Sequence, residues 1–452
     1  MTDSRHVGIV GGGLLGMTLA MRLRRDGFRV TLIEGAGAPG GLVAPQTIGG
    51  YRWDRFYHVI LLSDANLRGL LDELGLDEKI EWRTTRTGFY VDGTLHSLSS
   101  SLEFLTFPPL SLVDKVRLAY TIWYAAHLTN WRRLEGIPVI DWLRRLSGAR
   151  TVERIWRPLL KSKLGENYRL ASAAFIWAII ARLYAARRSG LKREMFGYVQ
   201  GGYEHVLARL RQRLDEMGIA VQCGKPVARV TNHDDGVSVG LNDGETLPFD
   251  DVVLTIPSNR AAALCPQLPV EERERLESVV YQGIICASLL TRRPLASYYV
   301  TNITDGWVPF TAVIEMTTLV DPATFGGNSL VYLPRYLAQD DPFWNKSDDE
   351  IREEFSAALL RMYPHFRRED VVEFKVARVR EMLAVTTLHY TERALPPLRT
   401  SLEHVFIANS AQIANGTLNA NETIGLANER ARELSAWFRA HTPAGAMQSG
   451  LP

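Results

Sequence analysis

The chain has 452 residues, of which 46% are hydrophobic and 23% charged, so it belongs with ordinary globular proteins and is long enough for two domains. Its formal net charge of +2 provides no overall field that would attract nucleic acid, and no nucleic-acid partner is expected. The three cysteines lack CxxC or His-spaced partners, which argues against a disulfide framework or a metal site and indicates a reducing compartment, the cytoplasm.

The N-terminal segment has the pattern of a βαβ unit. Residues 1–5 are polar and precede the apolar run His6–Val10, which predicts a buried strand with no signal peptide before it. One helical stripe follows and stops at Asp26-Gly27; its members are Leu15, Leu19 and Leu23. The β-branched run Phe28–Ile33 then predicts a second strand.

The remaining elements alternate between helical and strand-like regions. Residues 64–191 are mostly helical in pattern, and an amphipathic helix starts at Gly201. Strands are predicted at 219–222, 227–231, 237–241, 252–256, 329–333 and 405–408. A long helix from about 421 to 439 ends the ordered chain, and the tail from Thr442 has a disordered composition. No run of about eighteen uncharged apolar residues predicts a membrane span.

These elements predict an α/β fold in which a Rossmann-like nucleotide-binding domain is interleaved with a mixed helical and β-sheet substrate domain. We expect the nucleotide-binding domain to consist of residues 1–63, 200–268 and 399–440. The helical part of the substrate domain is expected at 64–199, its sheet at 269–398, and a disordered tail at 441–452.

Three glycines, Gly11, Gly13 and Gly16, form a GxGxxG motif between the first strand and the first helix. Gly11 permits a tight turn, Gly13 lets the backbone approach a pyrophosphate, and Gly16 allows close packing of helix on strand. Glu34 ends the second strand, where a carboxylate accepts hydrogen bonds from a ribose hydroxyl and repels the 2′-phosphate of NADP. The motif predicts a dinucleotide site.

Three later segments resemble the superfamily of flavin-containing amine oxidases, protoporphyrinogen oxidases and phytoene desaturases. The first is the glycine pair Gly40-Gly41. The second is the central block 200–257, which contains Gly201-Gly202-Tyr203. The third is the strand 405–409 with the helix that follows it. The resemblance covers nearly the whole chain, with its convincing motifs in these segments.

The resemblance implies FAD as the cofactor. Besides Gly11, Gly13, Gly16 and Glu34, the implied contacts are Leu15, Gly35, Gly41, Leu42, Val227, Thr255, Asn409 and Thr423. The family usually has an acidic residue where Asn409 stands and often an arginine where Leu42 stands; an Asn carbonyl still accepts from a ribityl hydroxyl. No cysteine follows Cys286, so the FAD is expected to be non-covalent.

Two residues are candidates for the chemistry. His58 lies in a segment that, in the family, runs along the flavin ring, and that is also similar to the histidine loop of UDP-galactopyranose mutase. It is interpreted either as a donor or proton shuttle at the flavin or as a residue that packs this turn. Arg335 ends a predicted strand and is interpreted either as a clamp for a substrate carboxylate or phosphate or as a partner in an ordinary ion pair.

The leading functional hypothesis is an FAD-dependent oxidoreductase that takes a hydride equivalent from a C–N or C–C unit of a small organic substrate. The alternatives are a flavin-dependent isomerase or mutase acting on a sugar or isoprenoid, and a non-catalytic FAD-fold binding protein. Residues 104–131 and 175–184 are rich in apolar side chains, and a basic stretch, 187–193, follows. This pattern indicates either a lobe resting on an anionic membrane or a helical cap with its own core. The sequence gives no indication of oligomeric state.

Overall fold

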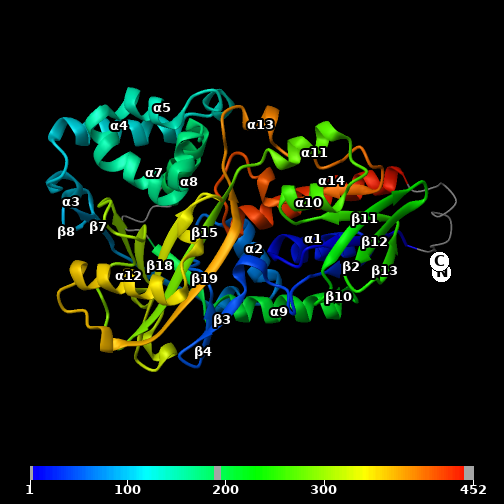
Figure 1. Cartoon of the computed structure of the whole chain (residues 1–452), viewed down its shortest axis with the longest axis horizontal. Helices are drawn as coiled ribbons and strands as arrows, with labels where there is room; N and C mark the ends of the chain where they lie inside the picture. The colour runs from blue at the N-terminus through cyan, green and yellow to red at the C-terminus, as the bar shows by residue number, and fades with distance from the viewer. Residues whose placement is uncertain (1–3, 188–194, 442–452) are drawn as a thin grey trace.

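The computed structural model describes residues 4–187 and 195–441. The predicted disordered tail from Thr442 and most of the basic stretch 187–193 lie outside the described residues. Figure 1 shows a parallel sheet on the right, a large and mostly antiparallel sheet nearer the centre and a helical lobe at the upper left. The predicted α/β fold class is confirmed.

The parallel sheet has the strand order β10-β2-β1-β14-β20. Its strands come from three separate stretches of the chain: β1 His6–Val10, β2 Arg29–Ile33, β10 Ala220–Gln222, β14 Asp251–Leu254 and β20 Val405–Ile407. The order reverses at β1, because the chain continues from β1 to β2 on one side while β14 pairs on the other. A crevice at such a switch point is where open α/β sheets bind ligands.

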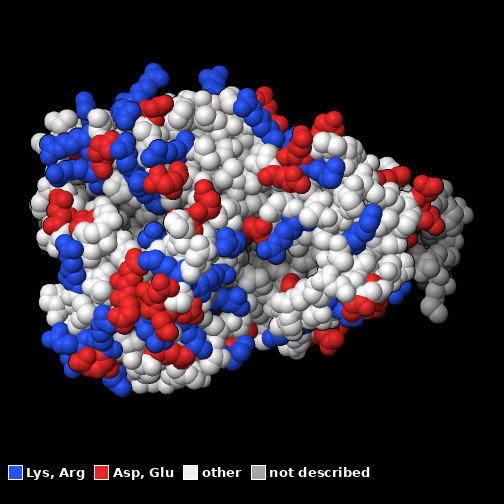
Figure 2. Space-filling model, in the orientation of Figure 1, with Lys and Arg blue, Asp and Glu red and all other residues white. Residues whose placement is uncertain are grey.

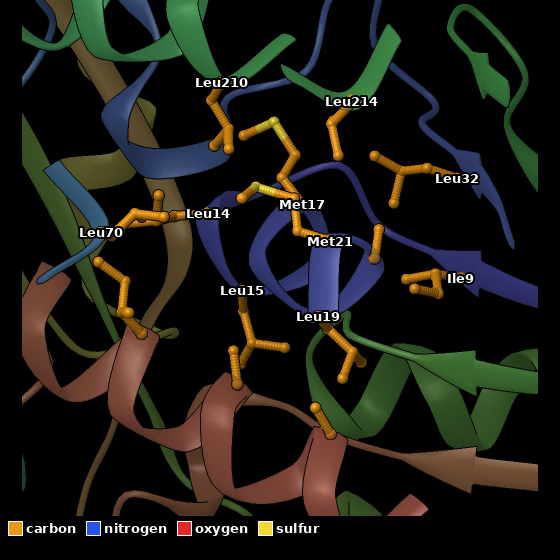
Figure 3. Packing of buried hydrophobic residues seen from close by; sticks show 14 of the residues in the cluster. Ile9, Leu14, Leu15, Met17, Leu19, Met21, Leu32, Leu70, Leu210 and Leu214 are labelled. Carbon is orange, nitrogen blue, oxygen red and sulfur yellow. The ribbon is translucent and has the colours of Figure 1, made fainter. Parts of the chain in front are cut away.

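Helix α1 (Leu14–Arg25) is packed on several sides rather than along the single predicted stripe. Figure 3 shows Leu15 and Leu19 pointing toward α14 (Ala420–Ala440), while Met17 and Met21 point toward α9 (Gly202–Glu216). The predicted stripe of Leu15, Leu19 and Leu23 is buried, and further residues of α1 are buried as well because α1 lies between two other helices and the sheet. Its predicted end at Asp26-Gly27 is confirmed, since Asp26 is the C-cap.

A small antiparallel sheet extends beyond β10 and β14. It consists of β11 Val227–His233, β12 Gly236–Leu241 and β13 Thr246–Phe249. Two helices then follow β14, α10 Ser258–Leu264 and α11 Val270–Glu277. The predicted strands of this region are all present, with ends that differ by one or two residues.

The large sheet has the order β19-β15-β18-β17-β16-β7-β8. Its strands are β7 Thr87–Val91, β8 Thr94–Ser97, β15 Tyr281–Thr291, β16 Val300–Ile303, β17 Ala312–Glu315, β18 Ser329–Leu337 and β19 Val371–Ala384. Helix α12 (Asp348–Met362) covers one face, where Phe355 is fully buried. The other face packs against the segment that follows the glycine pair.

The stretch 64–191 was predicted to be mostly helical, and this is wrong for residues 80–97. Strands β7 and β8 form a hairpin whose two-residue turn is Asp92-Gly93, with φ of 50° and 75°. Positive φ at both turn residues is the geometry that an Asp-Gly pair favours between two strands. The pair was therefore a local signal for a hairpin.

The rest of that stretch forms the helical lobe, with a core of its own. Its helices are α3 Ser101–Thr106, α4 Leu112–His127, α5 Val139–Ser147, α6 Ala149–Thr151, α7 Arg157–Leu164 and α8 Ala173–Arg187. The remaining short elements connect the regions: α2 Ala65–Glu73, α13 Tyr390–Arg393, β3 Pro45–Ile48, β4 Tyr51–Asp54, β5 Ile60–Leu61, β6 Ile80–Thr84 and β9 Met195–Val199. In the described part of the chain, no helix has the length and apolarity needed to span a bilayer.

Candidate cofactor site and active site

The glycine loop leaves open space in front of the N-terminus of α1. Gly13 is the N-cap of this helix, with no side-chain cap, and a Cβ atom built on Gly13 would meet nothing within 4 Å. The first N–H groups of a helix have no partner within the helix and favour an anion. The Leu15 side chain is buried in the core, so only its backbone N–H is available at this end.

Gly11 and Gly16 are fixed by close contacts between α1, β1 and β14. Gly11 has a φ of +114°, which favours glycine, and a Cβ on Gly16 would lie 2.0 Å from the Gly11 carbonyl oxygen. The Thr255 hydroxyl donates to the carbonyls of Val10 and Gly11 at 3.0 and 2.9 Å. In this structure Thr255 therefore supports the glycine turn.

Glu34 lies at the end of β2 and faces the glycine loop. Its carboxylate accepts from the N–H groups of Gly12, at 2.7 Å, and Ala36, at 2.8 Å. Each oxygen retains a lone pair for a hydroxyl donor. The neighbouring Gly35 lies beside the start of β11, since a Cβ on Gly35 would be 3.6 Å from the Cα of Pro226, next to Val227. Glu34, Gly35 and Val227 thus converge at one end of the loop.

The second glycine pair docks directly on the first loop. The Gly40 N–H donates to the Gly12 carbonyl at 2.8 Å, and Gly13 and Gly40 form a β-bridge. A Cβ on Gly41 would lie 3.2 Å from the Cα of Gly13. Leu42 is half-buried against the core that faces the large sheet. The glycine pair therefore lies where a pyrophosphate at α1 would pass.

Asn409 is buried at the end of β20, with an exposed fraction of 1%. Its amide nitrogen donates to the Ile256 carbonyl at 2.9 Å and to the Ser258 hydroxyl at 3.1 Å, and its oxygen accepts from the Ala411 N–H at 3.0 Å. The side chain joins the ends of β20 and β14. An acidic residue could not donate to the Ile256 carbonyl, which accounts for an amide at this position.

Replacement of Asn409 by aspartate is expected to destabilise the fold by about 1–3 kcal/mol, because a buried carboxylate would face the Ile256 carbonyl without a proton to donate. Thermal unfolding at neutral pH measures the effect. Asn415→Asp, the same substitution at an exposed position in the next loop, is the matched control and should leave the melting temperature unchanged. Equal melting temperatures for the two variants would contradict this account of Asn409.

The helix that follows Asn409 begins at Ala420, capped by Asn419, whose side chain accepts from the Glu422 N–H at 3.0 Å. Thr423 lies in its first turn, and its hydroxyl donates to the Asn419 carbonyl at 2.8 Å. The Thr423 oxygen retains acceptor capacity but its proton is used. This end of α14 matches the helix predicted from about residue 421.

His58 lies after β4, half-buried, with its ring centroid 4.9 Å from that of Tyr203. Its Nδ1 is buried without a hydrogen-bond partner, and the nearest carboxylate oxygen, Oδ2 of Asp54, is 3.7 Å away. Asp54 accepts from the Tyr203 N–H at 2.7 Å, at the start of α9. The Nδ1 atom of His58 is therefore available to a further hydrogen-bonding group.

Gly202, in the predicted Gly201-Gly202-Tyr203 motif, makes the approach of Asp54 possible. Its φ is +67°, and a Cβ there would lie 2.9 Å from the Asp54 carboxylate. The Asp54 backbone carbonyl in turn accepts from the Tyr332 hydroxyl of β18 at 2.6 Å. Asp54 therefore ties the segment that carries His58 to both α9 and the large sheet.

Arg335 does not converge with His58. Successive strand residues face opposite sides, and Arg335 faces the side of β18 covered by α12, where its guanidinium lies 4.1 Å from the Phe343 ring centroid and donates to the Pro309 carbonyl. Burial lowers the pKa of this guanidinium. The structure thus gives Arg335 a packing role away from the site, and we do not retain it as a catalytic candidate.

The opposite face of β18 carries a polar group that sequence reasoning missed. The Lys163 ammonium, from α7, donates to the Tyr336 hydroxyl at 2.8 Å, and the Tyr336 and Tyr57 hydroxyls are 2.7 Å apart. Burial raises the pKa of both Tyr57 and Tyr336, so both hydroxyls remain protonated at neutral pH. Lys163 and Tyr336 are 173 residues apart in sequence, and no local pattern signals their contact.

The residues present fit an FAD molecule in three respects. The space at Gly13 accommodates a pyrophosphate at the N-terminus of α1, Glu34 has lone pairs for ribose hydroxyls, and Val227 lies beside Gly35 for the adenine end. The described cysteines, Cys223, Cys265 and Cys286, are free thiols. Across residues 4–187 and 195–441, no cluster of three or more His, Cys, Asp or Glu side chains has the arrangement of a metal site.

Comparisons with known proteins agree with this geometry. A model of the family described as flavin containing amine oxidoreductase matches residues 16–419. Coproporphyrinogen III oxidase of Mycobacterium leprae is 26% identical over 285 residues, which are 59% of this chain and 62% of that relative. The match therefore spans less than two thirds of the relative's length. The 15-cis-phytoene desaturase of Capsicum annuum is 21% identical over 429 residues, 88% of this chain and 71% of the relative.

Among solved structures, a putative protoporphyrinogen oxidase from Exiguobacterium sp. 255-15 superposes with a TM-score of 0.78. It is 18% identical and covers 97% of this chain and 100% of its own. At that identity the superposition establishes the fold alone. The predicted superfamily and its flavin cofactor, FAD, are confirmed by the family match.

Proposed function

This chain belongs to the flavin containing amine oxidoreductase family, and we propose that it is an FAD-dependent oxidoreductase acting on a small organic substrate. The observation that carries the proposal is the arrangement of the glycine loop, with open space at Gly13 and with Glu34 and Gly40 beside it. Bound FAD supplies a hydride acceptor at N5. The substrate unit proposed to give up hydride is a C–N or C–C bond.

The proposed active site lies between the loop after β4 and the large sheet. In the family, this loop runs along the flavin ring, and Tyr57 projects from it to the face of β18 that carries Tyr336. The Lys163 ammonium cannot accept a hydrogen bond, so it is the donor in its contact with the Tyr336 hydroxyl. A Tyr336 hydroxyl that donates to Tyr57 leaves the Tyr57 proton for the substrate. We propose that this chain of donors orients the substrate's reacting end and holds a proton at Tyr57.

Removal of the Tyr57 hydroxyl by Tyr57→Phe is expected to slow flavin reduction by substrate roughly a hundredfold while FAD content stays unchanged. Tyr299→Phe is the matched control, because the Tyr299 hydroxyl is buried in the same core with no hydrogen-bond partner. Stopped-flow absorbance measures the reduction rate. Equal rates in wild type and both variants would remove Tyr57 from the proposed chemistry.

His58 is proposed to hydrogen-bond a flavin carbonyl or to move a proton there, since its buried Nδ1 has no partner in the protein. His58→Ala is expected to retain stoichiometric FAD and to lower turnover by about tenfold or more. Visible absorption gives the FAD content, and steady-state kinetics gives the turnover. Unchanged kinetics would leave His58 with its packing contact to Tyr203 alone.

The substrate experiment is anaerobic bleaching of the oxidised flavin. The names of the relatives supply the first compounds to test: coproporphyrinogen III, protoporphyrinogen and 15-cis-phytoene. In an oxidoreductase the flavin bleaches in one turnover and recovers its colour when air or another electron acceptor is admitted. A compound that is converted only after prior chemical reduction, with no net redox change, would instead identify an isomerase or mutase. Bound FAD that no substrate or reductant can reach would indicate a non-catalytic binding protein.

A further inference from the structure

Helices α3 and α4 lie at the outer edge of the helical lobe (Figure 1), and both expose large apolar side chains. Leu102 and Leu105 of α3 are 71% and 56% exposed. On α4, Leu112, Val113, Val116 and Trp123 are 70%, 62%, 62% and 53% exposed. We call these six residues the α3–α4 apolar face. A contiguous exposed apolar patch on a globular protein marks an interaction site.

Helix α4 exposes large apolar residues on the side that faces away from the lobe core. Its buried side contains Leu118 and Ala125 together with the polar residues Asp114, Lys115 and Thr121, while Leu112, Val113, Val116 and Trp123 face outward. The buried polar groups are satisfied, since the Lys115 ammonium donates to the Leu105 carbonyl at 2.6 Å and the Thr121 hydroxyl lies 2.8 Å from that of Ser147. The lobe's own core therefore does not use the α3–α4 apolar face, which remains available to a partner.

Aromatic side chains continue this surface along α4. The rings of Tyr120 and Trp123 have centroids 6.1 Å apart, and Tyr120 stacks on Tyr124 at 6.0 Å. Leu112, Val116, Tyr120 and Trp123 follow one helical stripe. Aromatic rings with one polar atom favour the boundary between apolar and aqueous phases, as at a membrane surface.

Positive charge surrounds the apolar face. Residues 101–187 contain 14 Lys and Arg against 6 Asp and Glu, a net charge of +8, whereas the whole chain has +2. Figure 2 shows Lys and Arg gathered over this lobe at the upper left. Arg117, Arg132, Arg133 and Arg145 are exposed, and the ion pairs found among the described residues of the lobe involve other basic side chains.

We propose that the α3–α4 apolar face docks on an anionic membrane surface. An exposed amphipathic helix inserts its apolar side into the headgroup boundary, and nearby arginines attract anionic lipids. A second copy of the chain is a poorer occupant, because a two-fold interface would place two lobes of the same positive charge together. This inference is independent of the proposed reaction.

The test is co-sedimentation of the full chain with vesicles, measured by protein in the pellet. Wild type is expected to pellet with vesicles of equimolar phosphatidylcholine and phosphatidylglycerol, much less with phosphatidylcholine alone, and less as salt rises. The double variant Val116→Ser/Trp123→Ser should bind roughly tenfold more weakly. Val270→Ser/Leu360→Ser, at exposed positions elsewhere, is the matched control and should bind like wild type. Arg132→Gln/Arg133→Gln should reduce the preference for anionic vesicles severalfold.

Four outcomes would overturn the proposal. Wild type that stays in the supernatant with anionic vesicles would show that no docking occurs. Equal binding to the anionic vesicles and to phosphatidylcholine vesicles would show that the positive charge of the lobe does not contribute to membrane docking. Equal binding by the Val116→Ser/Trp123→Ser variant and its control would place docking elsewhere. Self-association without vesicles that this variant abolishes, measured by sedimentation velocity, would assign the face to a second copy of the chain.

Discussion

Gly13→Val is expected to yield a folded, colourless protein. Gly13 has φ and ψ of −73° and 178°, which any residue adopts, and a Cβ there meets nothing within 4 Å, so the added Cβ makes no clash within the protein. The added methyl groups would occupy the space in front of α1 that a pyrophosphate needs. FAD affinity should fall by on the order of a hundredfold or more. Absorbance near the flavin bands and circular dichroism together measure the effect.

The control for Gly13→Val is Gly306→Val, which adds the same side chain at an exposed turn position where a Cβ also meets nothing within 4 Å. This variant should be as yellow as wild type. Because both substitutions leave the fold intact, a difference in colour between them reports on the cofactor alone. Stoichiometric FAD in the Gly13→Val protein would contradict the proposed location of the pyrophosphate.

Gly16→Ala is expected to have a different effect, a lower stability of the fold itself. The new Cβ would lie 2.0 Å from the Gly11 carbonyl oxygen, a backbone atom that accepts from the Thr255 hydroxyl, and 3.0 Å from that hydroxyl itself. Helix α1 would have to move away from the sheet that it packs against. The expected destabilisation is about 3 kcal/mol, measured as a lower midpoint of urea unfolding.

Gly69→Ala is the matched control, and it is expected to raise the stability of the fold where Gly16→Ala lowers it. Gly69 is exposed on α2, and a Cβ there meets nothing within 4 Å. Alanine is a better helix former than glycine, so this variant should be more stable than wild type by up to about 1 kcal/mol. A Gly16→Ala protein with an unchanged urea midpoint would contradict the close approach of α1 to the Gly11 turn.

The parts of the fold that the sequence predicted are those whose signals are local. About thirty consecutive residues contain the GxGxxG loop, the strands on either side of it and the acidic residue at the end of β2. The Asp92-Gly93 turn was also local, but the surrounding helical pattern obscured it. Local sequence could not predict which residues pack against α1, because the side of α1 that faces away from the sheet is buried by residues of α9 and α14.

The active site was harder to predict because its contacts are long-range. Both faces of β18 are buried, so its sequence shows no alternation that would tell which side Arg335 or Tyr336 faces. Lys163 comes from the helical lobe and reaches Tyr336 only in the folded chain. Asn409 was interpreted as a substitute for an acid, and only the structure shows that its amide donates to the Ile256 carbonyl.

We propose that this chain holds FAD at the glycine loop. The most direct test is the visible absorption spectrum of the purified protein, with the released chromophore identified by mass. Flavin bands and the mass of FAD are expected, with FAD released by denaturation without proteolysis because the cofactor is expected to be non-covalent. A colourless protein that also fails to take up added FAD would contradict this proposal.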